Sequence, residues 1–166
     1  MESISFRPMT RDDLPLMTEW LGREHVRRWW RDARTPEAVE AAYGPAIDGF
    51  EPTRMFVIEL DGRPAGSIQT YLASDHPEWI GDEQGVAGVD LFIADDDLTG
   101  RGLGPRVLAE FMREIVFADP AVTSCAASPD LGNAASIRAF EKAGFTPVRE
   151  IPGDHGPELL MRIERT

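Results

Sequence analysis

The segment from 86 to 117 constrains the fold most, because it joins an apolar strand to an amphipathic helix through a glycine-rich turn. The strand is apolar apart from Asp90, the turn spans 100–104, and Pro105 is predicted to open the helix. Glycines let backbone N–H groups face an anion, and a helix N-terminus adds positive potential. The segment therefore predicts a diphosphate cradle, with an ordinary strand–turn–helix connection as the alternative.

The turn differs from two well-known phosphate-binding sequences. No Lys-Ser/Thr pair follows its last glycine, so it is not a Walker loop. It also lacks the full Gly-x-Gly-x-x-Gly spacing of a dinucleotide-binding fold.

Length and charge bound the class of protein. With 166 residues the chain can bury a real core, so we expect a single domain over residues 1–166. It has no apolar run of membrane-spanning length and no signal-peptide pattern at its start, which indicates a cytoplasmic protein without a membrane partner. A formal net charge of −12 disfavours nucleic acid and favours cationic small molecules, unless the acidity serves only solubility.

Cysteine and histidine are sparse. Cys125 is the single cysteine, which excludes an internal disulfide, and its place in a predicted strand indicates a structural role. The histidines at 25, 76 and 155 show no ligand spacing, so we predict no metal site.

The order of predicted elements indicates an α/β (α+β) fold with a mixed, mostly antiparallel sheet flanked by helices. Polar, turn-rich residues 74–85 are expected to form a loop. The expected strands are 3–9, 54–60, 63–73, 86–93, 122–127, 145–151 and 158–163, and the expected helices are 11–21, 36–47, 105–117 and 133–143.

This order, the glycine-rich turn and the segment NAASIRAFEKAGF together resemble the GNAT acetyltransferases over nearly the whole chain. The likeness is greatest to the aminoglycoside 6'-N-acetyltransferases, through MTRDDLPLMTEWLGREHVRRWW, DGRPAGSIQTYLA and GVAGVDLFIA. It implies that an amine attacks the thioester of acetyl-CoA directly in a ternary complex. Such a route needs no cysteine nucleophile.

The resemblance also implies which residues hold acetyl-CoA. Arg101 adds a cation beside the phosphates, and Thr99 is a small departure from the usual Gln or Arg. The implied groups are the backbone of Phe92, Ile93 and Ala94 for the pantetheine arm, then Gly100, Arg101, Gly102, Leu103, Gly104 and Pro105 for the diphosphate, and Asn133 near the thiol.

Asp90 is the strongest candidate for the catalytic residue. A carboxylate in an apolar strand is costly unless a cation or a hydrogen-bond donor meets it. A substrate ammonium would be that cation, and a nearby arginine is the alternative. In the resembling enzymes an acid at this position holds the reactive amine and takes its proton.

Further acceptor-binding side chains are implied by the same resemblance. Adjacent tryptophans cannot both point into a core from an ordinary helix, so one is expected to form a wall for a cationic ligand. The alternative is a tryptophan that fills the gap between two helices. The candidate residues are Trp29, Trp30, Tyr43, Trp79, Glu83, Ser128 and Asp130.

The chain departs from the family pattern at two positions. Phe140 stands where many GNAT proteins carry a tyrosine that protonates the departing thiolate, so we expect slower chemistry or another donor such as Ser136. Ser128 stands near an aspartate of the aminoglycoside enzymes, and Asp130 could partly replace that charge. The second departure weakens the case for a polycationic antibiotic.

We therefore expect an acetyl-CoA-dependent N-acetyltransferase for a cationic small molecule, with the 6'-amine of aminoglycosides as the favoured acceptor and antibiotic resistance as the associated role. Two alternatives stay open. One is a lysine or hydroxylysine N-acyltransferase of siderophore assembly, and the other is a non-catalytic acyl-CoA sensor. Either a monomer or a homodimer is compatible with the sequence.

Overall fold

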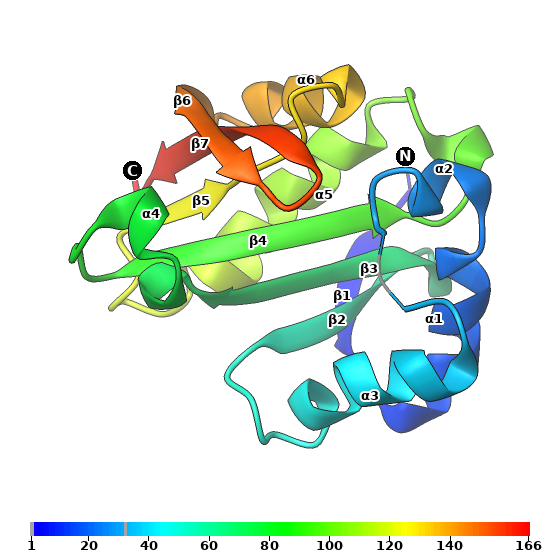
Figure 1. Ribbon diagram of the computed structural model, residues 1–166. Coiled ribbons are helices and arrows are strands. Elements are labelled where there is room, and N and C mark those ends of the chain that lie inside the picture. Colours follow the sequence, from blue (N-terminus) through cyan, green and yellow to red (C-terminus); the bar gives the residue numbers. More distant parts are fainter. Residues whose placement is uncertain (1, 32) are drawn as a thin grey trace. The chain divides into compact units, whose positions relative to one another are not determined.

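The computed structural model describes residues 2–31 and 33–166 (Figure 1). Contacts divide the chain into two compact units, residues 1–69 with 91–98 and residues 70–90 with 99–166. The boundary passes through two strands, so each unit combines segments that are distant in the sequence. A single domain over residues 1–166 stays a prediction.

Seven strands form one mixed sheet in the order β1-β2-β3-β4-β5-β7-β6, and the expected fold class is confirmed. The pairing of β4 with β5 is parallel, whereas β1–β2, β5–β7 and β6–β7 are antiparallel. The strands are β1 (Ile4–Pro8), β2 (Arg54–Leu60), β3 (Arg63–Leu72), β4 (Val86–Ile93), β5 (Ser124–Ala127), β6 (Thr146–Gly153) and β7 (Gly156–Glu164).

The register of β4 and β5 determines where a cleft can open in the second unit. Val86, Ala87 and Gly88 pair with residues 124–126, and β5 ends one residue later, at Ala127. Because the pairing stops at Gly88, Asp90 lies beyond the point where the two strands part. Its side chain is therefore not covered by a β5 residue paired with it.

The first unit packs the helices α1 (Leu14–Leu21), α2 (Glu24–Arg27) and α3 (Pro36–Ile47) with β1 and β2. Its core includes Met17, Leu21, Val39 and Val57, each with no exposed surface. The predicted helix at 11–21 begins instead as a 3₁₀ turn (Arg11–Asp13). Pro15 explains this, because it has no N–H to bond the carbonyl four residues earlier.

The second unit holds the helices α5 (Leu103–Phe111) and α6 (Ala134–Lys142) and the β6–β7 hairpin (Figure 1). α5 continues through a π-helical turn (Met112–Val116), close to the expected end of the helix. Its start differs from the prediction, since the helix begins at Leu103 and Pro105 is the third residue. Proline is tolerated there because the first four helical N–H groups have no helical acceptor.

The predicted loop at 74–85 contains two short helices, a 3₁₀ turn (Ala73–Asp75) and α4 (Pro77–Ile80). Proline at the first helical position favours α4, and burial of Trp79 holds it against Val86, Ala126 and Leu160. The expectation of an irregular loop was therefore wrong for these residues. A further 3₁₀ turn (Asp96–Leu98) follows β4.

Among the described residues, no helix has the length and apolar character needed to cross a bilayer.

We predict that Gly66→Ala destabilises the protein. A Cβ on Gly66 would lie 2.2 Å from the carbonyl oxygen of Phe92 and 3.2 Å from the Cα of Ile93, and backbone atoms cannot rotate away. The free energy of unfolding, measured by urea denaturation, should fall by about 2 kcal/mol. Gly22→Ala is the control, because its nearest contact is 3.4 Å, and equal stability of the two variants would contradict the prediction.

Candidate active site

The glycine-rich turn of the second unit presents open space at the start of α5. Gly100 and Gly102 have φ values of +72° and +77°, and a Cβ built on either would meet no heavy atom within 4 Å. Gly102 is the N-cap of α5, and it has no side chain that could cap the first helical amides. Arg101 between them is exposed. The turn therefore fits an anion.

Asn133 has a structural task as well as its predicted one. It is the N-cap of α6, and its Oδ1 accepts a hydrogen bond from the backbone N–H of Ser136 at 3.2 Å. About two turns later, Phe140 is buried, edge-to-face with Phe145 at a centroid distance of 5.0 Å. A role for Asn133 toward the thiol stays a prediction.

The end of β4 lies in the first unit, and its backbone is fixed from two sides. The N–H of Ala94 donates to the carbonyl of Ala65 at 2.8 Å, and the carbonyl of Ala94 accepts from Arg23 at 2.7 Å. The Nε2 of His25 lies 2.9 Å from the carbonyl oxygen of Ile93, which requires the Nε2–H tautomer. Sequence reasoning missed both anchoring side chains. Arg23 and His25 thus fix the backbone of Ile93 and Ala94, which is part of the segment predicted to contact pantetheine.

Two of the three predicted aromatic walls of the first unit belong to its core. Tyr43 is only 7% exposed, and Trp30 packs edge-to-face on Phe92 at 5.0 Å. Trp29 is partly exposed in the turn after α2. These contacts favour the reading of Trp30 as a plug between packed elements. A ligand-facing role for Trp29 and Tyr43 stays a prediction.

Asp90 in the second unit is partly buried and bonded to a tyrosine that sequence reasoning missed. Tyr71 on β3 is hydrogen-bonded to the Asp90 carboxylate. The pKa of the tyrosine is raised well above its usual value, mainly by burial and then by the negative charge of Asp90 and the hydrogen bond to it. The ring of Tyr71 lies across Gly88, where a Cβ would come within 2.2 Å of it. The hydroxyl therefore stays a donor, and the carboxylate is held in place.

A second carboxylate, Glu158 at the start of β7, lies near this pair. Burial raises its pKa, and the charges of Asp154, Asp130 and Asp90 act in the same direction, while a hydrogen bond from Ser128 opposes them. Ser128 and Asp130 thus lie close to Glu158, a residue that the sequence analysis did not single out. A lone glutamate opening an apolar strand was the signal that could have revealed it.

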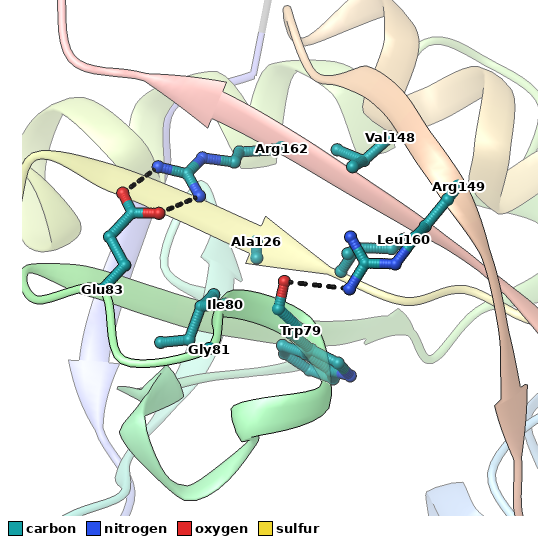
Figure 2. A pocket seen from close by; sticks show the side chains of 9 residues that line it. All are labelled: Trp79, Ile80, Gly81, Glu83, Ala126, Val148, Arg149, Leu160 and Arg162. Carbon is teal, nitrogen blue, oxygen red and sulfur yellow. Dashed lines mark hydrogen bonds and ion pairs between the residues drawn. The ribbon is translucent and has the colours of Figure 1, made fainter.

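Trp79 and Glu83, two predicted acceptor residues, line a pocket of about 350 Å³ with α4, β5, β6 and β7 (Figure 2). Arg162 points toward Glu83 and forms a two-bond ion pair with it, one bond measuring 2.8 Å. The bond lowers the pKa of Glu83. The ring of Trp79 stacks on His76 at 4.2 Å. Glu83 therefore already has a cation, which speaks against its binding a substrate amine.

Cys125 has no exposed surface, and burial raises the pKa of its thiol far above its usual value, so it is not a thiolate nucleophile. Residues 2–31 and 33–166 contain no group of three or more potential metal ligands.

Comparison with known proteins identifies the arrangement. The model of an acetyltransferase (GNAT) domain matches residues 9–152. The chain belongs to the GNAT acetyltransferase family. This acetyltransferase is 33% identical to the aminoglycoside N(6')-acetyltransferase type 1 of Klebsiella pneumoniae, over 96% of this chain and 82% of that protein.

Solved structures of a related enzyme agree with this assignment. AAC(6')-Ib in complex with paromomycin and acetyl-CoA superposes with a TM-score of 0.89 at 34% identity, covering 98% of this chain and 94% of that one. Its complex with coenzyme A and kanamycin gives 0.88 at 34% identity, with coverages of 98% and 95%. The protein is thus an acetyl-CoA-dependent acetyltransferase similar to the aminoglycoside enzymes.

We predict that Glu158→Gln stabilises the acetyltransferase at neutral pH. The pKa of Glu158 is raised on folding, so the folded state loses stability as pH rises and this carboxyl ionises near Asp90, Asp130 and Asp154. Glutamine avoids that charge and can still bond Ser128. The gain should reach about 1 kcal/mol at most, because Glu158 is partly exposed.

The measurement is the melting temperature of both proteins from pH 4 to pH 8. The gain should shrink toward the acid end, where the glutamate is protonated in both folded and unfolded chains. A gain that is constant across this range would assign it to packing instead of charge.

Proposed function

We propose that this acetyltransferase transfers the acetyl group of acetyl-CoA to the 6'-amine of aminoglycosides, within one catalytic domain spanning residues 1–166. The observation that carries the proposal is the Asp90 carboxylate, which Tyr71 holds beyond the paired part of β4 and β5. An ammonium group is the cation that satisfies a carboxylate placed in this way. Modification of such an antibiotic would confer resistance.

Acetyl-CoA supplies the activated acetyl group, and the open turn before α5 fits its diphosphate. The left-handed glycines Gly100 and Gly102 leave room that any larger side chain would reduce, and the first amides of α5 point from the helix start. Arg101 adds a positive charge beside them. The backbone of 92–94, anchored by Arg23 and His25, would meet the pantetheine arm.

The proposed chemistry is direct aminolysis of the thioester. Asp90 binds the acceptor ammonium and accepts a proton as the amine becomes nucleophilic. The nitrogen then bonds to the acetyl carbon, the carbon–sulfur bond breaks to release the CoA thiolate, and the nitrogen passes its second proton to water. Because Phe140 has no hydroxyl, water supplies the proton to that sulfur. A thiol of pKa near 8.5 is a tolerable leaving group without full protonation.

Relatives support an aminoglycoside as the acceptor. Besides the Klebsiella enzyme, a kanamycin resistance protein of Rhizobium radiobacter is 34% identical over 48% of this chain and 72% of that protein. Aminoglycosides carry several ammonium groups, and the acceptor region of the second unit carries several carboxylates. The charges of ligand and site are complementary.

A lysine or hydroxylysine side chain is the second candidate acceptor. The lysine N-acyltransferase MbtK of Mycobacterium sp. (strain MCS) is 26% identical over 99% of this chain and 68% of that protein. Its acceptor amine would engage Asp90 in the same way.

Release of CoA from acetyl-CoA with kanamycin, tobramycin, lysine or hydroxylysine distinguishes these functions. Turnover with the aminoglycosides is the expected result, and turnover with the amino acids alone would favour the second candidate. Calorimetric binding of acetyl-CoA without turnover on any amine would instead indicate an acyl-CoA sensor. Absence of binding would reject the acetyl-CoA site.

We predict that Asp90→Asn lowers kcat/KM for kanamycin more than about tenfold, because asparagine neither pairs with the ammonium nor accepts its proton. The affinity for acetyl-CoA, measured by calorimetry, should change little. Asp12→Asn is the matched control, since Asp12 is exposed in the first 3₁₀ turn. Wild-type kinetics in the Asp90 variant would remove this carboxylate from the mechanism.

A further inference from the structure

The backbone places Glu158 beside the loop that follows β5. Glu158 and Asp130 form an isolated antiparallel bridge. The N–H of Leu131 donates to the carbonyl of Pro157 at 3.0 Å, and the N–H of Leu159 donates to the carbonyl of Pro129 at 2.9 Å. The segment 129–131 therefore runs alongside the first residues of β7. This pairing fixes the Cα of Glu158 next to the end of β5.

The side chain of Glu158 is held as firmly as its backbone. Ser128 donates a hydrogen bond to its carboxylate. On the other side, a Cβ built on Gly153 would lie 2.2 Å from Oε2 of Glu158, so the carboxylate fills the space that a side chain on β6 would take. A side chain at 153 would therefore push the Glu158 carboxylate out of this position.

Asp130 does not provide the same group. Its Oδ1 accepts the backbone N–H of Gly132 at 2.9 Å, a local bond that turns the loop before α6. One carboxylate oxygen of Asp130 is therefore engaged in a local backbone bond, and its role toward a substrate amine stays a prediction. The carboxylate beside the Ser128 hydroxyl is that of Glu158.

The surroundings of Glu158 favour a bound cation. Besides burial, the negative charges of Asp90, Asp130 and Asp154 raise the pKa of Glu158. In addition to burial, the charges of Asp90 and Glu158 in turn raise the pKa of the Tyr71 hydroxyl. A partly buried carboxylate among like charges is unfavourable in the empty protein and gains most when an ammonium arrives.

We propose that Glu158 is a specificity-determining residue, which binds a second ammonium group of the acceptor while Asp90 engages the reacting amine. This inference rests on the proposed amine acetyltransferase function and deepens it. Glu158 supplies from β7 the negative charge that Ser128 cannot. The preferred acceptor is consequently a sugar with two or more amines, not a monoamine.

The test compares two acceptors in the wild-type and Glu158→Gln proteins. Kanamycin carries several amines, and methyl 6-amino-6-deoxyglucoside carries only one. The substitution should lower kcat/KM for kanamycin about tenfold, mainly through KM, because one charge-assisted bond is lost. For the monoamine the change should stay below about twofold. Glu150→Gln is the matched control, with the same change at an exposed position on β6.

A rescue experiment separates charge from structure. The double variant combines Ser128→Asp with Glu158→Gln. Residue 128 then carries the carboxylate, and residue 158 becomes its neutral hydrogen-bond partner. We expect kanamycin kinetics within about threefold of wild type. Glu158→Gln is also expected to be more heat-stable than wild type at neutral pH, so weaker kanamycin use cannot be attributed to unfolding. Should that variant fail to fold, Glu158→Asp tests the same contact by shortening it.

Calorimetric titration of kanamycin in the presence of CoA makes the two proposals distinguishable. Kanamycin binding that weakens in Glu158→Gln supports the inference even if no acetyl transfer is seen, in which case only the proposed function fails. Turnover in the wild type with unchanged kanamycin kinetics in Glu158→Gln overturns the inference and leaves the function intact. If the wild type neither binds nor acetylates kanamycin, both are rejected.

Discussion

The hydrogen bond between Tyr71 and Asp90 is the interaction on which the acceptor side of the site depends. It forms because the tyrosine ring can lie flat across Gly88, where any side chain would collide with it. Pairing of β4 with β5 ends at the same glycine, so the carboxylate lies beyond the paired part of the strands. Gly88 therefore makes room for the tyrosine that supports Asp90.

Two glutamates of the second unit contribute to stability in opposite ways. Glu158 is desolvated and surrounded by like charges, an arrangement that a polar neutral residue would improve. By contrast, Glu83 has an arginine partner and stabilises the attachment of its loop to β7. The two glutamates illustrate a useful distinction. A carboxylate with an internal cation contributes to the fold, whereas one held among acids by a hydroxyl is prepared for a cation from outside.

Local sequence patterns predicted much of this molecule. Strand and helix periodicity, together with the glycine-rich turn after the Asp90 strand, predicted the sheet, α5 and α6. The errors lie at helix ends, where Pro15 and Pro105 change the hydrogen bonding. Local sequence patterns did not predict the side chains that bond to Asp90 and Glu83. Tyr71 and Arg162 reach them through sheet pairing and packing, which periodicity does not encode.

The positions of the two proposed acceptor carboxylates separate chemistry from selectivity. Asp90 and its partner Tyr71 belong to β4 and β3, whereas Glu158 belongs to the β6–β7 hairpin and reaches the loop after β5. A substitution at Glu158 can thus change which amines bind without disturbing the Tyr71–Asp90 bond. The serine at 128 is then no loss of function, because it is the donor that orients the glutamate.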